Sequence, residues 1–122
     1  MDPYSDVLNK AGIDTESGLR RIGGKRERYE SLLRKFAVRQ AGTVVVIRAA
    51  LSRGDIATAE RDAHSLKGAA ATLGADLLAE DAAKAEAAIK SGVAVDEALL
   101  TLSRSLDAVL AAIRTALPAI GT

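Results

Sequence analysis

The feature that most constrains this fold is that apolar residues recur along the sequence at alternating spacings of three and four positions. Its clearest instance lies between Asp55 and Gly74, where the apolar positions are Ile56, Ala59, Ala63, Leu66, Ala70 and Leu73. This spacing is typical of the seam of an amphipathic helix in a bundle. Asp55 can cap the start of that helix, and Gly74 stands where a left-handed residue often ends one.

The same spacing predicts three further long helices. They span about 25–52, 76–90 with Asp76 as its cap, and 96–117 before Pro118. The branched run 43–47 would indicate a strand in isolation, but no second strand exists for it to pair with. We therefore predict a helix through this run, with room for a slight bend near Gly42.

Two shorter helical segments are predicted within residues 2–22. Asp2-Pro3 is a capped start with proline at the first helical position, and Gly12 and Gly23-Gly24 end the two segments. Because the four long helices are joined by short turns, we expect an all-α fold, an antiparallel up-down-up-down four-helix bundle over about 25–117. The one or two short helices would form a lid at one end, and residues 1–122 would form a single domain.

Composition removes several classes of function. The chain has no cysteine, one histidine and one methionine, so it lacks the ligands for a structural metal, a redox metal or a haem. A net charge of +1 does not demand nucleic acid, and the basic residues near 20–39 have no aromatic platform beside them. No apolar run approaches 18 residues. We expect a cytoplasmic protein with no membrane or nucleic-acid partner.

The single histidine, His64, lies on the predicted helix 55–73 about 120° from the apolar seam, which places it near solvent. Arg61 and Lys67 share its face. Gly68 also lies there, although glycine in a helix costs about 1 kcal/mol relative to the alanines that follow. An exposed imidazole with a nearby ammonium and a cleared patch favours attack on a phosphoryl group.

These residues resemble the signature of histidine-containing phosphotransfer (HPt) domains, the carriers of two-component phosphorelays. The central match is the run Ala63-His64-Ser65-Leu66-Lys67-Gly68, followed by Ala69-Ala70-Ala71 and Leu73-Gly74-Ala75. Further matches are Gly23-Gly24, Tyr29, Leu32, Leu33 and Phe36 upstream, and Leu78, Ala85, Glu86 and Gly92 downstream. The resemblance covers roughly residues 19–117.

The resemblance implies that neutral His64 takes a phosphoryl group from a receiver-domain aspartate through Nε2 and passes it to another response regulator. On this view the chain is a carrier and not a stand-alone enzyme. It needs no cofactor of its own, because the receiver brings its own Mg²⁺. The expected partners are receiver domains and a hybrid histidine kinase, and the expected state is a monomer. Lys67 would lie beside the phosphoryl oxygens, and Gly68 would clear space for the receiver.

The remaining candidates carry less specific signals. Arg61 could contact the phosphoryl group or the receiver, or serve solubility alone. Glu86 falls where the resemblance expects a polar neighbour that orients the histidine, but a carboxylate favours the imidazolium and repels phosphate. It could equally pair with Lys84, Lys90 or Lys67. An apolar docking patch is expected from Ala57, Ala71 and Ala75 with parts of the N-terminal segments.

Two other classes of protein compete with a phosphoryl carrier. The main alternative is a non-catalytic helical adaptor or dimerisation bundle in which His64 has no task. A histidine kinase dimerisation module also carries a histidine on a bundle helix. Such a module needs two chains for four helices and a glycine-rich ATP-binding domain, whereas this sequence predicts four long helices of its own and no nucleotide-binding stretch.

Overall fold

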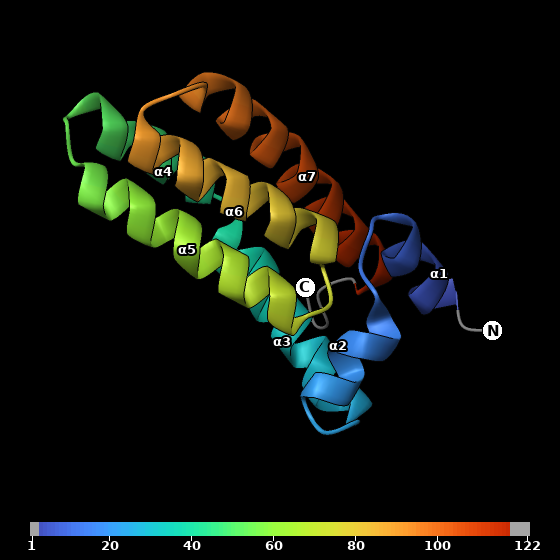
Figure 1. Ribbon diagram of the computed structural model, residues 1–122. Coiled ribbons are helices and arrows are strands. Elements are labelled where there is room, and N and C mark those ends of the chain that lie inside the picture. Colours follow the sequence, from blue (N-terminus) through green and yellow to red (C-terminus); the bar gives the residue numbers. More distant parts are fainter. Residues whose placement is uncertain (1–2, 118–122) are drawn as a thin grey trace.

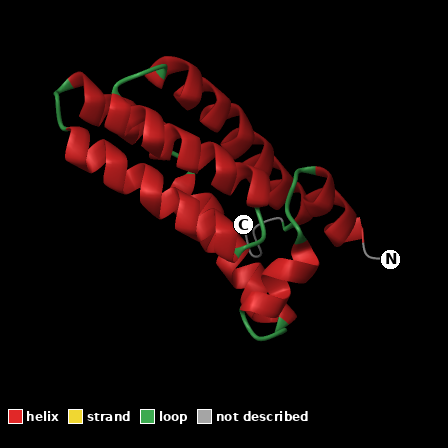
Figure 2. Ribbon diagram, viewed as in Figure 1, coloured by secondary structure: helices red, strands yellow, loops and turns green. Residues whose placement is uncertain are grey.

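The computed structural model describes residues 3–117, and all the regular secondary structure in that range is helical (Figures 1 and 2). The helices are α1 (Pro3–Lys10), α2 (Thr15–Arg21), α3 (Arg26–Gln40), α4 (Thr43–Ser52), α5 (Ile56–Thr72), α6 (Asp76–Ser91) and α7 (Val95–Ala116). The predicted all-α class is confirmed.

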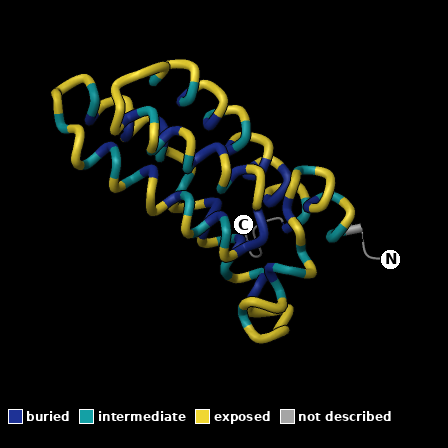
Figure 3. The backbone as a smooth tube through the Cα atoms, viewed as in Figure 1, coloured by how far each residue is buried: buried dark blue, intermediate teal, exposed yellow. Residues whose placement is uncertain are grey.

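The long helices pack around one core. Helix α5 packs against α4 and α6, α6 packs against α7, and α7 contacts α3 and α4, which closes the bundle. Figure 1 shows α5, α6 and α7 running along the same long axis, with tight turns reversing the chain between them. Leu33, Ile47, Leu66 and Leu102 from four different helices are fully buried. Figure 3 shows buried positions recurring between exposed ones along the long helices, as the spacing of threes and fours requires.

The predicted helix 25–52 is two helices in the structure. Helix α3 ends at Gln40 and α4 begins at Thr43, so the slight bend allowed near Gly42 is an interruption. The Val46 N–H already donates to the Gly42 carbonyl at 3.0 Å, and the helical pattern therefore resumes at once. The branched run is helical as predicted, with Val44 and Ile47 in the core.

The two N-terminal helices pack on different parts of the bundle, and α2 lies at the end of α5. Helix α1 packs on α7, and α2 contacts α3 and α5. The Tyr29 hydroxyl donates to the Leu73 carbonyl at 2.6 Å, and the Asp14 N–H donates to the Gly74 carbonyl at 2.8 Å. Burial of the Tyr29 hydroxyl, with the charges of Tyr4 and Asp14, raises its pKa well above the usual range. The phenol therefore stays protonated and keeps donating.

The helix ends agree with the sequence in most places. The Asp55 side chain accepts from the Thr58 N–H at 3.2 Å and caps α5, and Gly74 has φ +84° just after α5. The predicted cap at Asp76 is wrong by one residue, because Ala75 is the cap position of α6 and Asp76 is already helical. An acid in the first turn still complements the helix dipole. The predictions for Asp2 and Pro118 lie outside the described residues.

Candidate functional site

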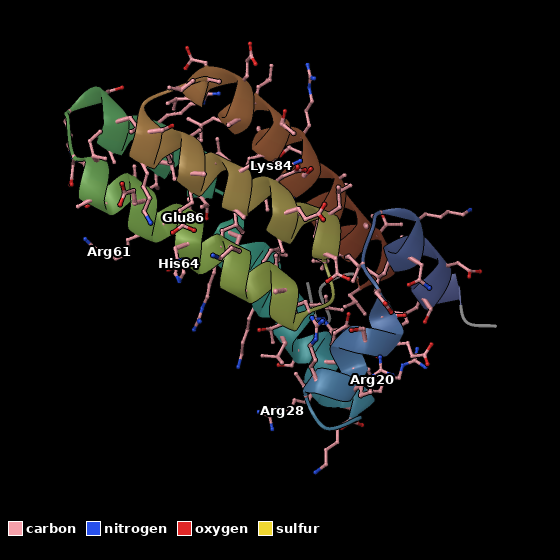
Figure 4. All side chains as sticks on the ribbon, in the orientation of Figure 1. Arg20, Arg28, Arg61, His64, Lys84 and Glu86 are labelled. Atoms are coloured by element: carbon pink, nitrogen blue, oxygen red, sulfur yellow. The ribbon has the colours of Figure 1, made fainter. Side chains whose placement is uncertain are left out.

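His64 lies on the solvent side of α5, and its ring is held by a carboxylate from α6. Its side chain is 64% exposed, while that of Glu86 is 15% exposed. The Nδ1 atom of His64 lies 3.1 Å from Oε2 and 3.3 Å from Oε1 of Glu86. Figure 4 shows the two side chains turned toward each other from the neighbouring helices. Small buried residues beside them, Ala63 on α5 and Ala85 on α6, allow the helices to come close.

This contact determines which ring nitrogen is available for chemistry. An ionised carboxylate only accepts hydrogen bonds, so the pairing with Glu86 puts the proton of His64 on Nδ1. The lone pair of the neutral ring is then on Nε2, on the other side of the imidazole from the carboxylate. The arrangement therefore combines a reachable nucleophilic nitrogen with a fixed ring orientation.

Lys67 completes a row of three side chains. Its Nζ lies 3.3 Å from Oε1 of Glu86, so the carboxylate bridges the ammonium and the imidazole. Burial of the Glu86 carboxyl by itself raises its pKa, but the hydrogen bonds and charges of His64 and Lys67 outweigh this, and the pKa lies below its usual value. Glu86 thus remains ionised near neutral pH. Of the three lysines considered for Glu86 in the sequence, its partner in the structure is Lys67.

Arg61 and Gly68 lie one helical turn on either side of His64. Arg61 is exposed (Figure 4), and it forms no ion pair with another residue in the range 3–117. A Cβ atom added to Gly68 would meet nothing within 4 Å, so packing inside the protein does not explain the glycine. The space that Gly68 leaves free opens outward, beside the imidazole.

The small apolar residues predicted to form a docking patch around His64 differ in their exposure. Ala57 is exposed and Ala71 is half-buried, one at each end of the His64 face. The Ala71 carbonyl accepts from the Arg21 guanidinium, which brings α2 to the edge of this face. Ala75 is only 1% exposed, so its predicted place in the docking patch is wrong, because the turn after α5 folds it into the core. Ile56, expected in the seam, is 44% exposed at the first turn of α5.

A close backbone contact between α2 and the end of α5 lies behind this face and is not among the sequence predictions. A Cβ atom on Gly18 would lie 2.2 Å from the Leu73 carbonyl oxygen, so only glycine lets α2 pack against the end of α5. Gly18 sits in a short helix where glycine is unfavourable, which is the one signal that could have marked it.

No group of three or more His, Asp or Glu side chains capable of holding a metal ion occurs within residues 3–117. Among the helices of that same range, none has both the length and the apolar character required to cross a bilayer. The chemistry available at the site is that of one exposed imidazole and the two charged side chains aligned with it.

A reachable, oriented imidazole on the side of a helical bundle defines a class of proteins that carry a group on histidine. The family model for the Hpt domain matches residues 31–117 of this chain. The chain belongs to the Hpt domain family, whose members take part in histidine phosphotransfer in two-component phosphorelays. Domains of this family are phosphotransfer carriers and are generally not stand-alone enzymes. Neither a curated protein nor a solved structure matches the chain.

Proposed function

We propose that His64 accepts a phosphoryl group from an aspartyl phosphate on a receiver domain and passes it to the aspartate of another receiver. The observation that carries this proposal is the pairing of Nδ1 with Glu86, which leaves Nε2 free on an exposed side chain. Membership of the Hpt domain family supports it.

In the forward step the Nε2 lone pair attacks the phosphorus, an N–P bond forms, and the P–O bond to the receiver's aspartate breaks. The aspartate leaves with the electron pair as a carboxylate. The imidazole gains positive charge as it reacts, and Glu86, at the Nδ1 side, stabilises that charge in the way the carboxylate of a catalytic triad does. The repulsion expected between Glu86 and phosphate is reduced, because the carboxylate faces the other ring nitrogen and is partly neutralised by Lys67.

The other residues at the site would act on the partner. Lys67, held at Glu86, supplies positive charge near the path of the phosphoryl group, and Arg61 offers a second cation one turn away. Gly68, Ala57 and Ala71 would let the receiver approach the ring. The metal ion of the transfer, Mg²⁺, would belong to the receiver. We further propose that the protein works as a cytoplasmic monomer with response-regulator receivers and a hybrid histidine kinase as partners.

The test uses receiver domains charged with radioactive phosphate and incubated with the whole chain. The wild-type protein should acquire a label that is stable to alkali and labile to acid, whereas His64→Gln should acquire none. Ser65→Ala is the matched control, because Ser65 is an exposed hydroxyl next to His64 and its loss should leave labelling intact. Equal labelling of wild type and His64→Gln would reject the carrier function and favour the non-catalytic adaptor.

The oligomeric state separates the carrier from a kinase dimerisation module. Sedimentation should give a monomer at the concentrations used for phosphotransfer. An obligate dimer would favour the dimerisation module.

A further inference from the structure

A groove between α3 and α5 borders the His64 face. Its volume is about 210 Å³. Leu32, Phe36 and Leu73 give it an apolar floor, and Ala69 and Thr72 form its wall on α5. The Thr72 hydroxyl donates to the Gly68 carbonyl at 3.0 Å, so this wall begins one turn from the space beside the imidazole. A protein docked over His64 and Gly68 would therefore also cover the groove.

The charged side chains that line this groove are both cations, Lys35 and Arg39. Both are exposed, and neither forms an ion pair with any residue in the described range 3–117. Arg28 continues the row, since it lies seven residues before Lys35 on the same side of α3. Figure 4 shows Arg28 and Arg61 on the side of the molecule that carries His64.

The acids nearby do not neutralise this row. Of the two acids on α3, neither lines the groove, and Glu30 is paired with Arg26 at 2.9 Å. Asp62 lines a separate depression of about 320 Å³ further along, which shares only Arg39 and Gln40 with the groove. The groove thus presents unpaired positive charge above an apolar floor.

We propose that this groove is a specificity site, which selects receiver domains whose docking face presents an apolar side chain flanked by carboxylates. The inference rests on the proposed function and adds to it the charge of the preferred partner. Leu32 and Phe36 would receive the apolar side chain, and Lys35 and Arg39 would pair with the carboxylates. A second copy of this chain is a poor occupant, because a symmetric contact through the groove would bring like charges together.

Complementary charge acts mainly on the association rate and on discrimination between partners. Receivers with an acidic docking face should therefore exchange phosphoryl groups with His64 faster than receivers with a neutral or basic one. The advantage should fall as ionic strength rises, because exposed pairs are screened over about 8 Å at physiological salt.

The experiment measures phosphotransfer from a panel of purified receiver domains to the whole chain at low and at physiological salt. Lys35→Glu combined with Arg39→Glu should slow transfer from the best receiver by at least about tenfold at low salt and reverse the salt dependence. The matched control is Lys84→Glu with Arg104→Glu, which makes the same change in net charge at exposed positions on α6 and α7. Figure 4 labels Lys84. The control should change the rate less than about threefold.

Two further measurements separate the groove from the chemistry. Phosphorylation of His64 by the small donor phosphoramidate needs no docking and should proceed equally in the wild type and both double variants. Ala69→Leu, which fills the groove without changing charge, should slow transfer from receivers while circular dichroism shows an intact fold.

The outcomes are distinguishable. If no receiver labels the wild type, the proposed function itself fails. If receivers label the wild type and the Lys35/Arg39 variant at the same rate, the carrier function stands and the groove inference is overturned. If sedimentation shows a wild-type dimer that the variant loses, the groove binds a second copy, and the inference is likewise overturned.

Discussion

The α5–α6 pair and α7 bury their faces in different ways. The buried residues of α5 are mostly alanines, Ala59, Ala63 and Ala70 around Leu66, and α6 adds Ala82 and Ala85 between Leu78 and Ile89. Helix α7 buries Leu99, Leu102, Leu106, Val109, Leu110, Ala112 and Ile113. Small side chains let two helices approach, and large ones fill volume. Helix α7 therefore contributes the largest set of bulky buried side chains, while the small residues of α5 and α6 set the distance at which Glu86 reaches His64.

The largest effect is expected from Leu102→Ala in α7. Leu102 is fully buried, so its truncation should lower the free energy of unfolding by about 2–5 kcal/mol through lost burial and a new cavity. Urea denaturation followed by circular dichroism measures this. Ala63→Gly on α5 is the comparison, with an expected loss of about 1 kcal/mol. If the two substitutions lower the free energy of unfolding equally, the contrast between the packing of α7 and that of α5 is wrong.

Enlarging a small residue between α5 and α6 should damage both stability and the site. Ala85→Leu, at a fully buried position one residue before Glu86, should lower the free energy of unfolding by about 1–3 kcal/mol. It should also separate Glu86 from His64, and nitrogen NMR of the imidazole would then show a mixture of tautomers. A stable variant with an unchanged Nδ1–H tautomer would contradict the role assigned to close helix approach.

Gly68→Ala should have opposite effects on stability and on transfer. Because a Cβ there meets nothing within 4 Å, the helix should gain about 1 kcal/mol in thermal or urea unfolding. Phosphotransfer from a receiver should nevertheless become slower, while phosphorylation by phosphoramidate should not. Faster or unchanged transfer would show that the receiver does not need this space.

The smallest expected effect is on the free energy of unfolding at acidic pH. The pKa of Glu86 is lowered in the folded protein, so its stabilising contribution is fully present above the ordinary carboxyl pKa of 4.5 and is lost as the pH falls through the lowered value. The difference in unfolding free energy between wild type and Glu86→Gln should be below about 1 kcal/mol and should shrink between about pH 5 and pH 3. If the difference in unfolding free energy instead grew as the pH fell, the lowered pKa of Glu86 would be contradicted.

Local spacing was enough to predict the helical class and the exposed position of His64. Each depends on which residues follow each other at threes and fours, and this information is local. The branched run near Val44 was assigned correctly only by asking what a strand there could pair with. The break after Gln40 is larger than the predicted slight bend, because a glycine in a helix signals weakness without giving the extent of the interruption.

Contacts between helices were harder to predict. The partner of Glu86 depends on the register between α5 and α6, and three lysines were equally plausible from the sequence. Ala75 was misplaced because a small residue after a helix suits either the core or the surface, and only the direction of the turn decides. The groove beside Lys35 depends on where α3 lies against α5. The periodicity within either helix does not predict this placement.

The anchoring of α1 and α2 bears on where this protein can be cut. The family match begins at residue 31, yet Leu8, Ile13 and Tyr29 before it are each at most 1% exposed. A version trimmed to the matched residues would bare the apolar surfaces that these side chains cover and release the carbonyl that Tyr29 binds at the end of α5. Anyone excising this module for crystallisation or for fusion to another protein should therefore keep the first thirty residues.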